Sequence, residues 1–217
     1  VTLEDGTTHT ARVPSGASTG KHEAMELRDG LGSSAKSFYG ALSVSKAVDN
    51  VNTKIAPSIV GKPVDLHSID QVIREIDTSA NFSTLGANAT LAVSLASAKA
   101  AAHSQNVSLA RFFQPKGNLL IPMPMVNILS GGAHANRSLD FQDVLIVPTG
   151  ASTFTEALSW IVAVRETAAK LGSDMGMTTH LVADEGGLGL SFKSIDEAID
   201  FVLSAINVVG LQIGSQV

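Results

Sequence analysis

The side chains with the clearest chemical potential fall in three short segments. The first, Val13–Gly20, reads Val-Pro-Ser-Gly-Ala-Ser-Thr-Gly. The hydroxyls of Ser15, Ser18 and Thr19 can ligate a hard cation or bind a phosphate, and the glycines permit unusual backbone angles. Such a loop can fold over a ligand as a lid. The same residues are also typical of a solvated turn after a hairpin, and composition alone favours that interpretation over a ligand-binding loop.

The second segment lies at the two ends of a short connection between apolar strands. It comprises Gly131-Gly-Ala-His134 and Phe141-Gln-Asp143. If the flanking strands pair antiparallel, the end of one and the start of the other share an edge, and His134, Gln142 and Asp143 converge there. A histidine beside a glycine turn is often only a loop residue, but the nearby amide and carboxylate make a binding site an equal alternative.

The third segment is Asp184-Glu185-Gly186-Gly187, directly after an apolar stretch that ends at Ala183. In a barrel, carboxylates at the C-terminal end of a strand face the active-site mouth. Paired acids can bind a metal, or one of them can remain protonated and act as a general acid. A polar turn after a strand is the simpler alternative.

The elements that would position these segments begin with a hairpin and three helices. Asp5-Gly6 is a tight-turn dipeptide, so residues 1–13 are expected to form two antiparallel strands. Apolar residues at spacings of three and four predict helices over residues 41–57, ended by Pro57, from the N-cap Asp65 to Ile76, and over Asn88–Ser104.

Beyond a Pro/Gly/Asn stretch at residues 114–118, short apolar segments alternate with helices, which predicts a parallel α/β sheet or barrel. Capping boxes at Thr153–Glu156 and Ser194–Glu197 predict helices to about Leu171 and Val209. The expected strands are Pro124–Leu129, Val144–Val147 and His180–Ala183.

Composition narrows the functional classes. The 217 residues include 15 Lys+Arg and 20 Asp+Glu, a net charge of −5, and 44% are hydrophobic, enough for a sizeable core. Basic residues are scattered, which argues against nucleic-acid or anionic-membrane partners. No apolar run approaches the roughly 20 residues of a membrane span. Cysteine is absent, which fits a reducing compartment, and we expect a cytoplasmic protein.

Taken together and in order, these segments resemble the enolase family. The resemblance rests on Val13–Gly20 with residues 22–30, the alanine-rich stretch of residues 85–96, Pro122–His134, and Val182–Gly187. It covers essentially the whole chain. It implies an α+β N-terminal cap domain over residues 1–113, followed by the first part of an enolase-type (α/β) TIM-like barrel over residues 114–217. It also implies a homodimer.

The resemblance further implies a glycolytic, Mg²⁺-dependent hydro-lyase, phosphopyruvate hydratase, which converts 2-phosphoglycerate to phosphoenolpyruvate. Carried over position by position, Ser18 would ligate Mg²⁺ and help enclose the substrate. His134 would close over the substrate and is counted with the catalytic residues, and Gln142 would contact the substrate. Glu185 would protonate the departing hydroxyl. Asp143 stands where the family usually has Glu, one methylene shorter.

Other departures keep alternatives open. Leu188-Gly-Leu190 replaces the family's usual aromatic residue and proline. The family's opening segment, metal-binding carboxylates, lysine base and phosphate-binding Arg and Ser have no counterpart, so we expect a piece of a longer chain that is inactive alone. A racemase-type relative would need a Lys-x-Lys pair, and there is no lysine between Lys116 and Lys170. A non-catalytic binding or structural protein is the third interpretation.

Overall fold

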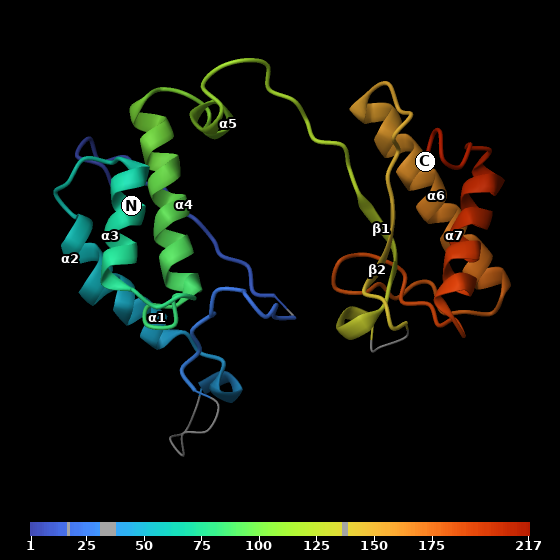
Figure 1. The fold of residues 1–217 in the computed structure, drawn as a ribbon, viewed down its shortest axis with the longest axis horizontal. Coiled ribbons are helices and arrows are strands. Elements are labelled where there is room, and N and C mark those ends of the chain that lie inside the picture. Colours follow the sequence, from blue (N-terminus) through green and yellow to red (C-terminus); the bar gives the residue numbers. More distant parts are fainter. Residues whose placement is uncertain (17, 31–37, 136–138) are drawn as a thin grey trace. The chain divides into compact units, whose positions relative to one another are not determined.

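The computed structural model describes residues 1–16, 18–30, 38–135 and 139–217. Ala17 of the loop Val13–Gly20, called the serine-rich loop below, lies outside the described residues. So do residues 31–37, residues 136–138 between the two parts of the second segment, and the side chain of His134. The chain divides into two compact units, Val1–Leu119 and Leu120–Val217, and each is described by itself (Figure 1). Within the described residues, no helix combines the length and apolar character needed to cross a membrane.

The first unit opens with the predicted hairpin, although its ladder is short. Thr2 and Thr8 form a single antiparallel bridge, and the Leu3 N–H donates to the Thr7 carbonyl at 2.9 Å. The Asp5 carboxylate accepts from the backbone N–H of Thr7 at 2.8 Å, which closes the turn.

Helices make up most of the rest of this unit. In chain order they are the 3₁₀ turn η1 (Phe38–Ala41), α1 (Ser45–Asn50), the π-helical turn η2 (Val51–Ile55), α2 (Ala56–Ile59), α3 (Leu66–Ile76), α4 (Ala87–Ser104) and α5 (Leu109–Phe113). The predicted helices from Asp65 and over Asn88–Ser104 are confirmed, and the Asp65 side chain accepts from the Ser68 N–H as an N-cap. The buried core between these helices consists of Ile55, Ile69, Ile73, Leu85 and Val93.

The expectation that Pro57 ends the first predicted helix is wrong. The helical path runs through Pro57 to Ile59, with the π-helical turn η2 directly before α2. A proline in a helix interior lacks an N–H and clashes with the carbonyl four residues back. Because Pro57 follows the π turn, it occupies the first turn of a new α-helical segment, where a missing N–H costs least.

The N-terminus of α1 is capped from a distant part of the chain. No side chain at its own N-cap, Val44, can accept a hydrogen bond. Instead the Asp29 carboxylate accepts from the N–H groups of Lys46 at 2.8 Å and Ser45 at 2.9 Å. The hydrogen bonds from Lys46, Ser43 and Ser45 hold the pKa of Asp29 well below its usual value. This contact fixes the segment before residue 30 to the helical part of the unit.

The second unit is built on two strands and two long helices. Strand β1 (Val126–Ser130) pairs antiparallel with β2 (Asp143–Ile146), which is the condition considered above for the second segment. The parallel pairing predicted from the alternation of strands and helices is not what these two strands adopt. The 3₁₀ turn η3 (Gly132–Ala135) follows β1. Helices α6 (Phe154–Asp174) and α7 (Ile195–Val209) contact each other, α6 contacts β1, and α7 contacts β2. Both predicted caps are confirmed, since Thr153 and Ser194 accept from the N–H groups of Glu156 and Glu197.

The prediction of a strand over His180–Ala183 is wrong. Val182 makes only one antiparallel bridge, to Leu188, and the Val182 side chain is 59% exposed. Leu188 and Leu190 are instead buried, at 0% and 2% exposure, and Leu188 also forms a parallel bridge to Leu129 of β1. The chain reverses at Gly186, whose φ is +84°, so the residues after the turn reach the core in place of those before it.

A buried carboxylate organises the loop before α4. Asp77, 3% exposed, accepts from the N–H groups of Ser79, Thr84 and Leu85, the last at 2.7 Å. Burial alone would raise the pKa of Asp77, but the hydrogen bonds from Ser79, Leu85 and Thr84 outweigh it and hold the pKa below its usual value. Asn50 completes the network by donating to the carbonyls of Thr84 and Leu85.

Replacing Asp77 with Ala should lower the free energy of unfolding by about 3 kcal/mol, because it leaves buried N–H groups without an acceptor. Since the folded-state pKa is depressed, this contribution is present above pH ~4 and is lost as pH falls through the folded pKa. Urea unfolding at several pH values measures both effects. Asp49→Ala, at an exposed carboxylate of the same unit, is the control and should cost little. Equal effects of the two substitutions would contradict the assigned role of Asp77.

Candidate active site

Three polar residues, Asn127, Ser130 and Asp143, meet in the second unit and are called the polar centre below. Their grouping depends on an irregularity in β1. In a regular strand, residues three apart point to opposite faces. The register between β1 and β2 shifts between Asn127 and Leu129, which is typical of a β-bulge. As a result, the side chains of Asn127 and Ser130 meet, and the Asn127 Nδ2 donates to the Ser130 Oγ at 2.8 Å.

The same amide holds Asp143, the first residue of β2. The Asn127 Nδ2 also donates to the Asp143 Oδ1, and Asp143 lies opposite Ser130 in the register. An amide must present its amino group, not its oxygen, to a carboxylate, so this contact fixes the orientation of the Asn127 side chain. Asp143 is thus a half-buried carboxylate with a defined donor.

The connection between the strands begins and ends at one place, as predicted. The Gly131 N–H donates to the Gln142 carbonyl at 2.6 Å, and the Gly132 N–H donates to the Leu139 carbonyl at 2.9 Å. The contact needs glycine, because a Cβ on Gly131 would lie 2.2 Å from the Phe141 carbonyl oxygen. Gln142 is exposed next to Asp143, and the backbone of His134 lies in η3.

The segment that carries Asp184 and Glu185 is a tight turn attached to β1. The Ala183 N–H donates to the Gly187 carbonyl at 2.9 Å, which closes the turn. Leu188 then donates its N–H to Ile128 at 2.9 Å, and its carbonyl accepts from the Ser130 N–H at 3.0 Å. Asp184 and Glu185 are both exposed at the tip. Two exposed carboxylates are therefore carried on a turn with a rigid base.

Gly187 is the closest point between this turn and the polar centre. A Cβ on Gly187 would lie 2.4 Å from the Ser130 Oγ and 2.8 Å from the Asn127 Oδ1. Real Cβ atoms do not approach other atoms so closely, so any side chain here would push the turn away from β1.

Helix α6 supports the outer side of the turn. The Arg165 Nη2 donates to the Gly186 carbonyl at 3.3 Å. Desolvation by burial lowers the pKa of Arg165 from its ordinary value, but a guanidinium remains charged in proteins. The turn is thus held by β1 on one side and by a cation on the other.

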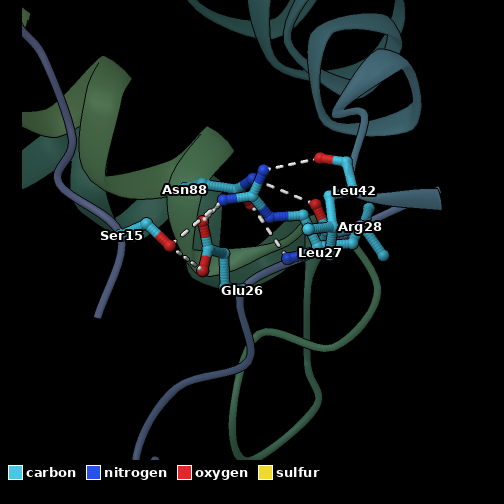
Figure 2. Close-up of polar contacts among 6 residues, drawn as sticks. All are labelled: Ser15, Glu26, Leu27, Arg28, Leu42 and Asn88. Carbon is cyan, nitrogen blue, oxygen red and sulfur yellow. Dashed lines mark hydrogen bonds and ion pairs between the residues drawn. The ribbon is translucent and has the colours of Figure 1, made fainter. Parts of the chain in front are cut away.

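In the first unit, the serine-rich loop starts from a charged anchor (Figure 2). The Ser15 hydroxyl donates to Glu26 Oε2 at 3.0 Å and accepts from Arg28 Nη2 at 3.2 Å. Arg28 forms an ion pair with Glu26 and donates through Nη1 to the Leu42 carbonyl at 2.6 Å. Ser15 is therefore engaged in a structural network, which removes it from the hydroxyls offered to a ligand.

The anchor is in turn fastened to helix α4. Asn88 accepts from the Leu27 N–H at 3.1 Å and donates to the Leu27 carbonyl at 3.0 Å (Figure 2). The other end of the loop is held by the Gly20 N–H, which donates to Glu23 Oε2 at 2.7 Å. Ser18 lies between these fixed ends and is exposed. A loop tied at both ends with an exposed hydroxyl is compatible with the predicted lid.

The donor groups for a metal ion are sparse. In the part of the chain that the structure describes, no three His, Asp or Glu side chains are grouped so that they could hold a metal ion. Mg²⁺ takes six oxygen ligands in near-octahedral geometry, commonly with one or two carboxylates. The described residues do not supply such a set by themselves, and Ser18 would contribute one hydroxyl at most.

Comparison with known protein families assigns both units. The family model described as "Enolase, N-terminal domain" matches residues 1–113, and the one described as "Enolase, C-terminal TIM barrel domain" matches residues 118–217. The chain belongs to the enolase family. The fold class inferred from the sequence, an α+β N-terminal domain followed by elements of an enolase-type barrel, is confirmed.

Three residues at the centre of this enolase-family unit were missed in the sequence: Asn127, Ser130 and Arg165. Asn127 and Ser130 carried a signal, because two polar residues interrupt an otherwise apolar strand and buried polar groups need partners. Arg165 carried none, since a single arginine on a helix is usually a surface residue.

Replacing Gly187 with Ala should lower the free energy of unfolding by about 1–3 kcal/mol, since its Cβ would overlap Ser130 and Asn127. Gly189→Ala is a matched control two residues away, where a Cβ would meet only Ala135 at 3.6 Å. Chemical denaturation of both variants measures the difference. If Gly187→Ala is as stable as Gly189→Ala, the turn is not seated on β1 as described.

Proposed function

We propose that the protein containing this chain is a hydro-lyase that converts 2-phosphoglycerate to phosphoenolpyruvate. Membership of the enolase family supports the reaction class. The observation that carries the site assignment is the attachment of two carboxylate-bearing segments, β2 with Asp143 and the turn with Glu185, to the same strand β1. Dehydration of this kind needs acid–base groups held in fixed relation to one another.

The roles proposed for the residues follow from the chemistry. A base must accept the α-proton, and in the family this base is a lysine, which has no counterpart in the present sequence. The electron pair left on the α-carbon then forms the double bond as the β-hydroxyl, once protonated, leaves as water. Glu185 would supply the proton to the departing hydroxyl, and Asp143 would be its fixed partner. Gln142 and His134, in the connection between β1 and β2 and at its end, would contact the substrate. Ser18 is also proposed as a substrate-binding residue because of the resemblance to the enolase family.

Mg²⁺ is proposed as the cofactor because the chain belongs to the enolase family. When bound, it would stabilise negative charge on the substrate carboxylate. Among the described residues only Ser18 is proposed as a ligand. A homodimer, a cytoplasmic location and a domain division at residues 113 and 114 are proposed on the same basis.

Replacing Glu185 with Gln should lower kcat by about 10²- to 10⁴-fold with little change in KM, because the charge on the leaving hydroxyl develops only in the transition state. Phosphoenolpyruvate formation from 2-phosphoglycerate in the presence of Mg²⁺, followed by ultraviolet absorbance in the natural full-length protein, measures this effect.

Asp184→Asn is the matched control, since Asp184 occupies the preceding position of the same exposed turn. It should reduce kcat much less. A Glu185→Gln enzyme within about threefold of the unmodified kcat, roughly 0.6 kcal/mol, would place the acid elsewhere, with Asp143 the next candidate. An unmodified protein without turnover would favour a non-catalytic enolase-family protein.

A further inference from the structure

The side chain of Asn127 lies between the two proposed carboxylate segments. Its Nδ2 group uses both hydrogens, one toward the Asp143 Oδ1 and one toward the Ser130 Oγ at 2.8 Å. Its Oδ1 faces the turn, because a Cβ on Gly187 would lie only 2.8 Å from that oxygen. One amide therefore touches β2 and borders the base of the turn that carries Glu185.

This arrangement is costly if it serves packing alone. The Asn127 Oδ1 is buried and, among the residues described, has no hydrogen-bond donor. A buried acceptor without a donor lowers stability, and an apolar side chain would avoid that cost. The amide is instead matched to Asp143, since only a donor can hold a carboxylate in one orientation.

The turn that carries Glu185 and the residue Asp143 are both held by strand β1. Leu188 exchanges backbone hydrogen bonds with Ile128 and Ser130, the residues that follow Asn127 in β1. A displacement of Asn127 would therefore change the position of Asp143 relative to Glu185. The relative position of two reacting groups is worth large rate factors, and an error of about 1 Å can cost about 10²-fold.

We propose that Asn127 is a positioning residue for the dehydration, which fixes the Asp143 carboxylate relative to the turn that carries Glu185. The inference rests on the proposed function. Asn127 acts through Asp143 and does not contact the substrate. Its loss should therefore affect the chemical step more than substrate binding.

The first test is Asn127→Ala in the natural full-length protein, assayed for conversion of 2-phosphoglycerate with Mg²⁺. We expect kcat to fall about 10- to 100-fold, with KM changed by less than about threefold. Asn50→Ala is the matched control: it removes two buried hydrogen bonds, to Thr84 and Leu85, from the first unit. It should lower the unfolding midpoint but leave kcat unchanged.

The second test exchanges the partners, with Asn127→Asp and Asp143→Asn combined. The exchange restores an amide–carboxylate pair, so the unfolding midpoint should recover relative to Asn127→Asp alone. The carboxylate then sits on the wrong residue, so kcat should remain low. Recovery of the midpoint therefore tests whether the two side chains pair, and the split between kcat and KM in Asn127→Ala tests the positioning role. If Asn127→Ala does not fold, Asn127→Ser, whose hydroxyl is too short to reach Asp143, replaces it.

The outcomes separate this inference from the proposed function. An unmodified protein without turnover refutes the proposed function, and the inference falls with it. An active protein whose Asn127→Ala variant stays within about threefold of the unmodified kcat overturns the inference alone. An exchanged double variant that recovers kcat would show that the Asp143 carboxylate is not needed, and would overturn both the role proposed for Asp143 and the inference.

Discussion

The polar centre of the second unit depends on the bulge in β1. Ile128 and Leu129 are consecutive, yet both are 0% exposed, which an alternating strand with one covered face would not allow. The register shift between Asn127 and Leu129 resolves this conflict and at the same time brings Asn127 and Ser130 together. One backbone irregularity thus accounts for both the packing of the core and the grouping of polar side chains around Asp143.

The close approach of three chain segments at this centre then requires residues without side chains. Gly131 lets the connection after β1 pass the carbonyl of Phe141, and Gly187 lets the turn approach Asn127 and Ser130. These glycines are demanded by space rather than by backbone angle, because neither has a φ in the left-handed region. Glycine at positions 131 and 187 is therefore explained by close contact with neighbouring segments and not by the conformation of a turn.

The features that could be predicted from the sequence are those that depend on contacts between residues close together in the chain. The caps at Asp65, Thr153 and Ser194 depend on a side chain and an N–H three residues away, and all three are present. The prediction of a strand at His180–Ala183 was wrong because packing against the rest of the fold decides which of these residues are buried. The alternating Leu188-Gly-Leu190 pattern after the Gly186-Gly187 turn matches the residues that are buried in the core. Long-range contacts, such as Asn127 with Asp143 or Asp29 with the start of α1, leave no local pattern.

The two proposed carboxylates are not equivalent, and their surroundings favour different roles. Asp143 is half-buried and bound by an amide that presents two N–H donors to fixed acceptors. The Asp143 side chain has the length that brings its Oδ1 to the Asn127 amide. Glu185 is exposed on a turn whose base is fixed by Leu188 and whose outer side is held by Arg165. A group that must deliver a proton needs access to the substrate, whereas its partner needs a constant orientation, so the exposure of Glu185 suits the role of proton donor proposed for it and the held side chain of Asp143 suits that of its partner.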